Sequence, residues 1–201
     1  IQQSRRAGIS VPLFSLRSSR GWGIGEIGDI PAASSWLRSA HQSVLQILPL
    51  NEIAPGESSP YSALSAMAID PQFISLWMLD GASIVEQVFA DELEIVRRSP
   101  RIDYRTVRSL KDLALKALFD RFFKTEWLPR TGKADVFRSY VLQESWWLDE
   151  YSLYRALRAE SGELPWTEWP EGVRDRDAFA LTQARTRLSK EILFHQYVQW
   201  V

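Results

Sequence analysis

Two short stretches of this sequence hold residue types that could do chemistry. The first, GIGEIG at residues 23–28, has the Gly-x-Gly-x-x-Gly spacing of loops that bind the pyrophosphate of a dinucleotide. Glu52 follows at roughly the ~20-residue distance at which an acid would bind the ribose. The second, SPYS at residues 59–62, offers hydroxyl groups and Tyr61, whose ring could stack on a sugar.

The surroundings of the glycines argue against a nucleotide site. In a dinucleotide loop the first glycine follows its strand directly, and the helix begins by the second glycine. Here residues 17–22 separate Gly23 from the preceding apolar stretch, and the helix-start residues Asp29 and Pro31 come after the third glycine. The spacing therefore favours a glycine-rich turn over a nucleotide-binding loop.

The elements around these stretches predict a parallel pair of strands. Residues 7–16 and 44–50 are apolar runs typical of strands buried on both faces. Between them, residues 30–41 carry apolar side chains at helical spacing, with Asp29 expected as the N-cap. A strand, a helix and a second strand in this order predict a right-handed crossover between parallel strands.

After residue 50 the pattern changes. Residues 51–72 form a long loop rich in Ser, Pro and Ala, and loops of this length are usually functional. A short apolar segment at 73–78 precedes a region that reads as helical from about residue 84 onward. The last of these helices is expected to run unbroken from about Asp177 to the end of the sequence.

Composition excludes several classes of function. The 201 residues include 24 basic and 25 acidic side chains, so no strong charge points to nucleic acid or to a membrane surface as a partner. The absence of cysteine excludes disulfides and cysteine–zinc sites. No apolar stretch approaches the ~18 residues of a membrane span. We expect a cytoplasmic chain with no metal and no cofactor.

Aromatic residues are unusually frequent, and nine of them are tryptophans. For each tryptophan, core packing is favoured over a stacking platform for sugar rings, because aromatic side chains dominate protein cores. His195 is likewise expected to be packed or on the surface rather than to shuttle protons. Five of the tryptophans gather in one region: Trp127, Trp146, Trp147, Trp166 and Trp169.

Taken in order, the motifs of the chain resemble those of the 4-alpha-glucanotransferases, also called amylomaltases or disproportionating enzymes. The resemblance covers essentially the whole sequence, and its strongest part is SPYSALSA at 59–66. The other matching stretches are RAGI at 6–9, SL at 15–16, GIGEIGD at 23–29, LQILPL at 45–50, DP at 70–71, IDY at 102–104, Lys111, WLDEY at 147–151 and PWTEWP at 165–170.

This resemblance implies a fold. It implies an α/β chain that forms the N-terminal part of a (β/α)8 TIM barrel, with a helical insertion after the second strand. Residues 1–80 would hold the first strand-helix-strand units and a substrate loop, and residues 81–201 a mostly helical insertion subdomain. The remainder of the barrel would be absent, and the incomplete barrel could associate with itself.

The resemblance also implies a reaction. Enzymes of the family transfer α-1,4-glucan units between maltodextrin or starch chains by a retaining double displacement that uses two carboxyl groups. By the family pattern these carboxylates lie beyond Val201, so we assign no catalytic residue and expect the isolated chain to be inactive. The expected partners are α-1,4-glucan oligosaccharides. The alternatives are a glucan-binding module without catalysis and a purely structural helical segment.

Three residues are candidates for the substrate site. Ser59 and Tyr61 match family positions that contact the sugar near the scissile bond. Without the resemblance, a capped turn with Tyr61 as a packed corner residue would be favoured. Asp70 either starts a turn before Pro71 or orients the loop from behind. Residues 51–58 lack the Gly-Tyr pair that binds glucan outside the active centre in some family members, so the sequence leaves open whether a second glucan site exists.

Overall fold

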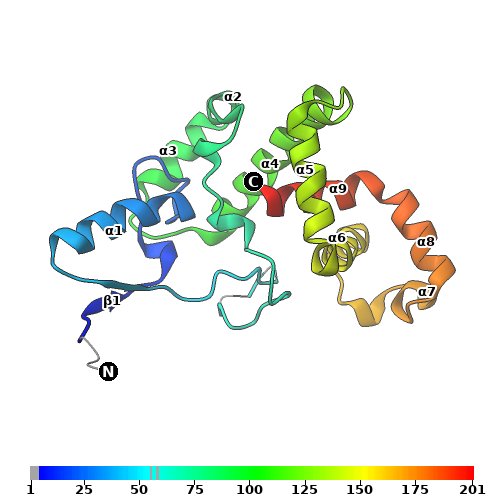
Figure 1. Ribbon diagram of the computed structural model, residues 1–201, viewed down its shortest axis with the longest axis horizontal. Coiled ribbons are helices and arrows are strands. Elements are labelled where there is room, and N and C mark those ends of the chain that lie inside the picture. Colours follow the sequence, from blue (N-terminus) through cyan, green and yellow to red (C-terminus); the bar gives the residue numbers. More distant parts are fainter. Residues whose placement is uncertain (1–4, 55, 58) are drawn as a thin grey trace. The chain divides into compact units, whose positions relative to one another are not determined.

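The computed structural model describes residues 5–54, 56–57 and 59–201, and the chain divides into two compact units (Figure 1). Unit 1 is Ile1–Leu118 and unit 2 is Phe119–Val201. The boundary falls within helix α4, Tyr104–Phe122. The boundary expected between residues 80 and 81 separates barrel from insertion and stays a prediction.

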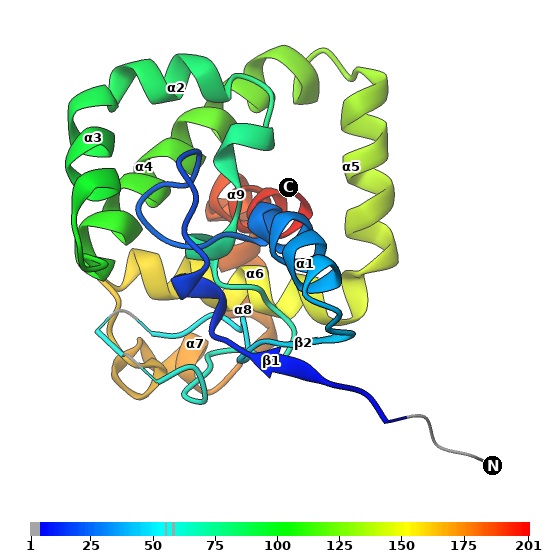
Figure 2. The same cartoon turned by 90° about the vertical axis from the view of Figure 1, so that its left-hand side faces the viewer.

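Unit 1 begins with the predicted pair of parallel strands (Figure 2). Strand β1, Gly8–Ser10, pairs in parallel with β2, Val44–Gln46, and α1, Ile30–Ser39, lies between them in sequence. The parallel pairing is confirmed, but the strands are much shorter than predicted. After Pro12 the chain turns into a 3-10 helix at Leu13–Ser15. Both strands are exposed at their outer residues, so the expectation of burial on both faces is wrong for this chain.

The glycine-rich stretch is a tightly packed turn. A Cβ on Gly25 would lie 2.0 Å from the carbonyl oxygen of Leu13, and one on Gly28 would lie 2.7 Å from Ser75 Oγ. Gly23 has a φ of +84°, which side chains with a Cβ rarely adopt. Trp22 is fully buried beside these glycines. The glycines thus allow close backbone packing, in agreement with the turn that the spacing favoured.

Asp29 corrects one prediction. It occupies the N-cap position of α1, but its side chain makes no cap hydrogen bond to that helix. Instead Asp29 Oδ2 accepts a hydrogen bond of 2.8 Å from the backbone N–H of Glu26. The Asp29 side chain thus bonds Glu26, the N-cap of the preceding 3-10 turn Ile27–Asp29, rather than the first turn of α1.

After the loop that follows β2, unit 1 continues as short 3-10 turns and helices. The expected apolar segment at 73–78 forms two 3-10 turns, Pro71–Phe73 and Leu76–Met78. Helices α2, Ala82–Val88, and α3, Ala90–Arg98, follow before α4. The helical spacing of Val107, Leu110, Ala114, Ala117 and Leu118 predicts one apolar stripe, and all of these residues except Ala117 are buried.

Unit 2 consists of helices joined by short turns. The helix predicted from Asp177 to the end is wrong in one respect, because it is two helices that meet at Leu188. Leu181, Leu188 and Ile192 all pack against the cluster of Leu153, Leu157, Trp169 and Ala184, so these apolar side chains on both sides of the break face one core. The elements are a π-helical turn at Phe123–Trp127, α5 Gly132–Gln143, α6 Ser145–Glu160, a 3-10 turn at Trp166–Glu168, α7 Glu171–Arg174, α8 Ala178–Arg187 and α9 Ser189–Trp200.

The five tryptophans between residues 127 and 169 divide into two groups. Trp169 is buried and Trp127 and Trp147 are half-buried, as core packing predicts, but Trp146 and Trp166 are 70% and 53% exposed. His195 is buried, which confirms the packed alternative. Among the residues that the structure describes, no helix combines the length and the apolar character needed to cross a bilayer.

Candidate functional site

The long loop after β2 is a closed hairpin in unit 1. Asn51 pairs with Ile69 and Ile53 pairs with Ala63, both in antiparallel bridges. The base is closed where Asp70 N donates a 2.8 Å hydrogen bond to the carbonyl of Leu50. The loop therefore has a paired base and a free tip, and the tip carries residues 59–61.

Ser59 and Tyr61 lie together at this tip. Ser59 Oγ accepts a hydrogen bond of 3.3 Å from Tyr61 N, and the Ser59 carbonyl accepts one of 3.1 Å from Ser62 N. The capped turn that local sequence suggested is therefore present. Tyr61, however, is 74% exposed, so it is not a packed corner residue. Its ring is available to a ligand.

Asp70 holds the base of the loop. Its carboxylate is fully buried. Oδ1 accepts a hydrogen bond of 3.0 Å from Gln72 N, at the start of the turn Pro71–Phe73. Oδ2 accepts bonds from Ile53 N at 3.3 Å and from the Arg108 guanidinium at 2.8 Å. Both interpretations of Asp70 thus have a structural basis, since it starts a turn and also ties the two sides of the loop together.

A buried ion pair lies behind the loop and joins it to the glycine-rich turn. Lys111 Nζ donates to the carbonyls of Gln72 at 2.6 Å and Ile74 at 2.7 Å, and lies 2.7 Å from Glu26 Oε1. Both charged side chains have no exposed surface. Burial lowers the pKa of Lys111 and raises the pKa of Glu26, and the attraction between the two opposes each shift.

Sequence reasoning missed Glu26, Arg108 and Lys111 as a group. One signal could have found part of it. Lys111 follows Leu110 directly and borders the apolar stripe of α4, where a lysine is buried only with a partner. Arg108 lies three residues earlier and therefore on the same side of the helix. Neither position reveals its partner from the sequence alone.

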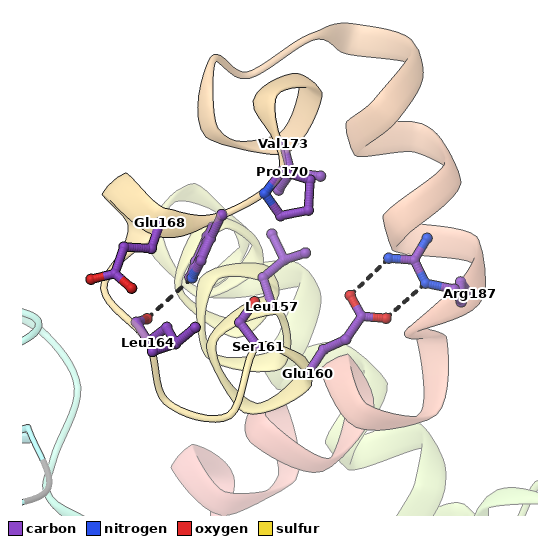
Figure 3. A pocket seen from close by; sticks show the side chains of 9 residues that line it. Leu157, Glu160, Ser161, Leu164, Glu168, Pro170, Val173 and Arg187 are labelled. Atoms are coloured by element: carbon purple, nitrogen blue, oxygen red, sulfur yellow. Dashed lines mark hydrogen bonds and ion pairs between the residues drawn. The ribbon is translucent and has the colours of Figure 1, made fainter.

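Unit 2 contains a pocket of about 380 Å³, which is distinct from the loop (Figure 3). Its apolar lining includes Leu157 and Trp169. At its edge Arg187 Nε and a terminal nitrogen each lie 2.8 Å from the carboxylate of Glu160, and Trp169 Nε1 donates to the Leu164 carbonyl at 3.1 Å (Figure 3). These polar groups bond to one another, and no site residue expected from the sequence lines the pocket.

The described residues bring together no group of three or more His, Asp or Glu side chains placed to hold a metal ion. The loop presents an aromatic side chain and hydroxyl groups at its tip, and buried charges hold its base. Such a set can bind and orient a polar ligand with an apolar face.

Comparison with known proteins identifies the family. The sequence model described as 4-alpha-glucanotransferase, glycoside hydrolase family 77, matches residues 11–201. The chain belongs to this family. The resemblance that the motifs suggested is thereby confirmed.

Relatives named 4-alpha-glucanotransferase show how much of a family member this chain represents. The protein from Thermus thermophilus is 32% identical over 181 residues, which are 90% of this chain and 34% of the relative. The protein from Chlamydia pneumoniae is 30% identical over a match 205 residues long, which covers 100% of this chain and 37% of the relative. The chain thus spans about a third of the length of these family members.

Solved structures support the fold. The amylomaltase from Streptococcus agalactiae in complex with acarbose matches with a TM-score of 0.79 at 24% identity, over 98% of this chain and 38% of that one. The amylomaltase from Corynebacterium glutamicum matches with a TM-score of 0.71 at 22% identity, over 97% of this chain and 26% of that one. The helix-rich α/β fold of this chain is therefore shared with part of these two amylomaltases.

Proposed function

We propose that this chain supplies one wall of the substrate site of a 4-alpha-glucanotransferase. That enzyme would transfer α-1,4-glucan units between maltodextrin, starch or glycogen chains. The observation that carries the proposal is the exposure of Tyr61 at the tip of a loop whose base is clamped by buried Asp70. An aromatic ring held out to solvent on a fixed base is poorly explained by packing, and family membership gives it a substrate.

The chemistry of the tip suits a sugar. The face of a tyrosine ring can stack on the apolar face of a pyranose. Ser59 Oγ uses an acceptor position for Tyr61 N, so its O–H stays available to donate to a sugar hydroxyl. The structure of the Streptococcus agalactiae amylomaltase with acarbose supports an oligosaccharide as the ligand of such a site.

The place of the loop in the fold is consistent with this function. We propose that β1 and β2 are the first two strands of a (β/α)8 barrel, and that further strands cover the faces that are exposed here. The loop at 51–72 follows the carboxyl end of β2, and that end of a barrel is where active sites are built. A cytoplasmic location would place the enzyme with its glucans.

The proposed mechanism is retaining, with two carboxyl groups roughly 5 Å apart, one as nucleophile and one as acid and then base. We propose that these groups lie beyond Val201, so the residues of this chain carry out no bond breaking. Their contribution is to bind the glucan and orient it, which lowers the barrier by fixing the reacting atoms in place.

A disproportionation assay tests this function. The protein is prepared at its full natural length and incubated with maltotriose, and the release of glucose and longer maltodextrins is followed. Tyr61→Ala is expected to lower kcat/KM by about tenfold or more, the effect of losing one aromatic contact. Phe179→Ala is the matched control, because Phe179 is 70% exposed on α8 in unit 2.

The outcomes separate the two parts of the proposal. No transfer by the wild-type protein would reject the enzyme, and binding of maltodextrin without transfer would favour a glucan-binding module instead. The exposed rings of Trp146 and Trp166 are the observation that favours that second candidate. Transfer that Tyr61→Ala leaves unchanged would reject the sugar contact alone.

A further inference from the structure

Helix α4 presents two cations to the segment that ends the loop. Arg108 reaches the Asp70 carboxylate at 2.8 Å. Lys111, three residues later, reaches the carbonyls of Gln72 and Ile74 at 2.6 and 2.7 Å. Residues three apart lie on one side of a helix. One face of α4 therefore bonds residues 70–74 through both cations.

The link from Arg108 to the loop passes through a single carboxylate. Asp70 is fully buried and bonds the backbone N–H of Ile53 on one side of the hairpin and that of Gln72 beyond the other side. A buried carboxylate needs a counter-charge to keep such bonds, because an uncompensated charge is costly away from water. Arg108 supplies that charge, so it stabilises the arrangement that fixes both sides of the loop base.

We propose that Arg108 is a positioning residue for the sugar-binding loop. It touches no substrate. It holds the Asp70 carboxylate in the hydrogen-bonded position that closes the base at Ile53, and the closed base sets the position of Tyr61 at the tip. The role in sugar binding rests on the function proposed above, whereas the role in holding the loop does not.

Arg108 and Lys111 differ in exposure. This difference lets a variant of Arg108 test the position of the loop without removing a fully buried charge from the core. The Lys111–Glu26 pair has no exposed surface, so its loss affects the core of unit 1. The Arg108 side chain keeps 22% of its surface exposed at the edge of the loop. Removal of its charge therefore loosens the loop base while the stripe of α4 remains packed.

The test compares three variants of the full-length protein. Arg108→Gln removes the charge, Arg108→Lys keeps a cation, and Arg105→Gln removes an exposed charge one turn earlier on the same helix as the control. The first measurement is amide hydrogen exchange in residues 51–69. We expect faster exchange of the Ile53 and Leu64 amides in Arg108→Gln, partial recovery in Arg108→Lys, and wild-type exchange in Arg105→Gln.

The second measurement is the kinetics of maltotriose disproportionation. Misplacement of the loop is expected to raise KM and to lower kcat/KM by roughly ten- to a hundredfold in Arg108→Gln, with partial rescue in Arg108→Lys. A merely structural role would reduce the amount of active enzyme, which lowers apparent kcat and leaves KM unchanged. If Arg108→Gln does not fold, the same measurements are made on the double variant Arg108→Gln with Asp70→Asn. In that variant a neutral amide replaces the uncompensated carboxylate.

Each outcome decides the proposal. Unchanged exchange in Arg108→Gln overturns it, and so does faster exchange with an unchanged KM. Equal effects of the Arg108 and Arg105 variants overturn it as well. A wild-type protein without transferase activity would reject the proposed function instead, and hydrogen exchange would still decide whether Arg108 holds the loop.

Discussion

Unit 1 and unit 2 are stabilised by different kinds of contact. In unit 1, the buried charges of Glu26, Lys111 and Asp70 hold irregular backbone in place, and all three side chains have no exposed surface. In unit 2, helices pack through rings, and several of the ion pairs lie at the surface. The ring centroids of Phe122 and Phe137 are 5.5 Å apart, and those of Phe122 and Tyr197 are 5.0 Å apart.

The difference follows from what each unit must do with its backbone. A helix satisfies its own peptide groups, so unit 2 needs only apolar contacts to hold its helices together. The 3-10 turns and the loop of unit 1 leave carbonyls without backbone partners, and buried carbonyls must be bonded. Lys111 bonds two of them at once, those of Gln72 and Ile74. Directional buried charges thus position a loop that apolar packing could not fix.

The largest expected effect is in unit 1. Lys111→Met keeps the length of the side chain and removes the charge, which leaves Glu26 and two carbonyls without their buried partner. We expect the free energy of unfolding to fall by about 3–5 kcal/mol, the usual cost of breaking a buried pair. Urea unfolding followed by tryptophan fluorescence measures this change.

The same variant has a defined pH dependence. Burial already raises the pKa of Glu26 above its ordinary 4.5, and Lys111 opposes that shift. Without Lys111 the pKa rises further, so the folded state binds the proton more tightly than the unfolded state. Stability of the variant therefore falls as pH rises above the unfolded pKa, and the deficit should be larger at pH 8 than at pH 5. Adding Glu26→Gln should remove this dependence; if it persists, the pair is not its source.

A matched change in unit 2 should cost less. Phe137 is fully buried, with ring contacts to four aromatic side chains. Phe137→Leu keeps an apolar side chain that neighbours can partly surround, so we expect a loss of about 1–2 kcal/mol. Val136→Ala is the control, because Val136 is 60% exposed on the same helix. A loss as large as that of Lys111→Met would remove the contrast between the units.

Features that depend on local side-chain spacing could be predicted from the sequence, whereas features that depend on distant partners could not. Helix α1 and the apolar stripe of α4 follow from the spacing of their side chains, and the parallel pairing of β1 and β2 follows from the crossover rule. The lengths of the strands do not follow. Pro12 and the turn after it end β1 early. No local pattern shows over how many residues a strand will pair with its neighbour.

The site was predictable in its tip and not in its base. Ser59 and Tyr61 stand within a contiguous motif, so the resemblance could identify them, although their contact with sugar stays a prediction. The base depends on pairs that are distant in sequence. Asp70 and Arg108 are 38 residues apart, and Lys111 and Gln72 are 39 apart. Such pairs exist only once the chain has folded, and a single sequence carries no trace of them.

The smallest effect is expected at a surface ion pair of unit 2. Glu150 lies 2.5 Å from Arg176 and 2.6 Å from Arg185, and the hydrogen bond from Arg176 is the main cause that lowers the pKa of Glu150. The Glu150 side chain is 51% exposed, so water and salt screen the attraction. We expect Glu150→Gln to lower the free energy of unfolding by less than about 1 kcal/mol.

The pH dependence of this pair has the opposite sign to that of Lys111→Met. A carboxyl whose pKa is lowered by folding stabilises the protein above its unfolded pKa, and that stabilisation is lost as pH falls through the lowered value. The difference between wild type and Glu150→Gln should therefore be present at pH 7 and shrink in acid, and Glu171→Gln controls for the loss of one charge. A difference above about 2 kcal/mol at pH 7 would exceed what exposed pairs contribute. Charged hydrogen bonds would then stabilise unit 2 as well as unit 1, and the two units would differ only in how much they depend on such bonds.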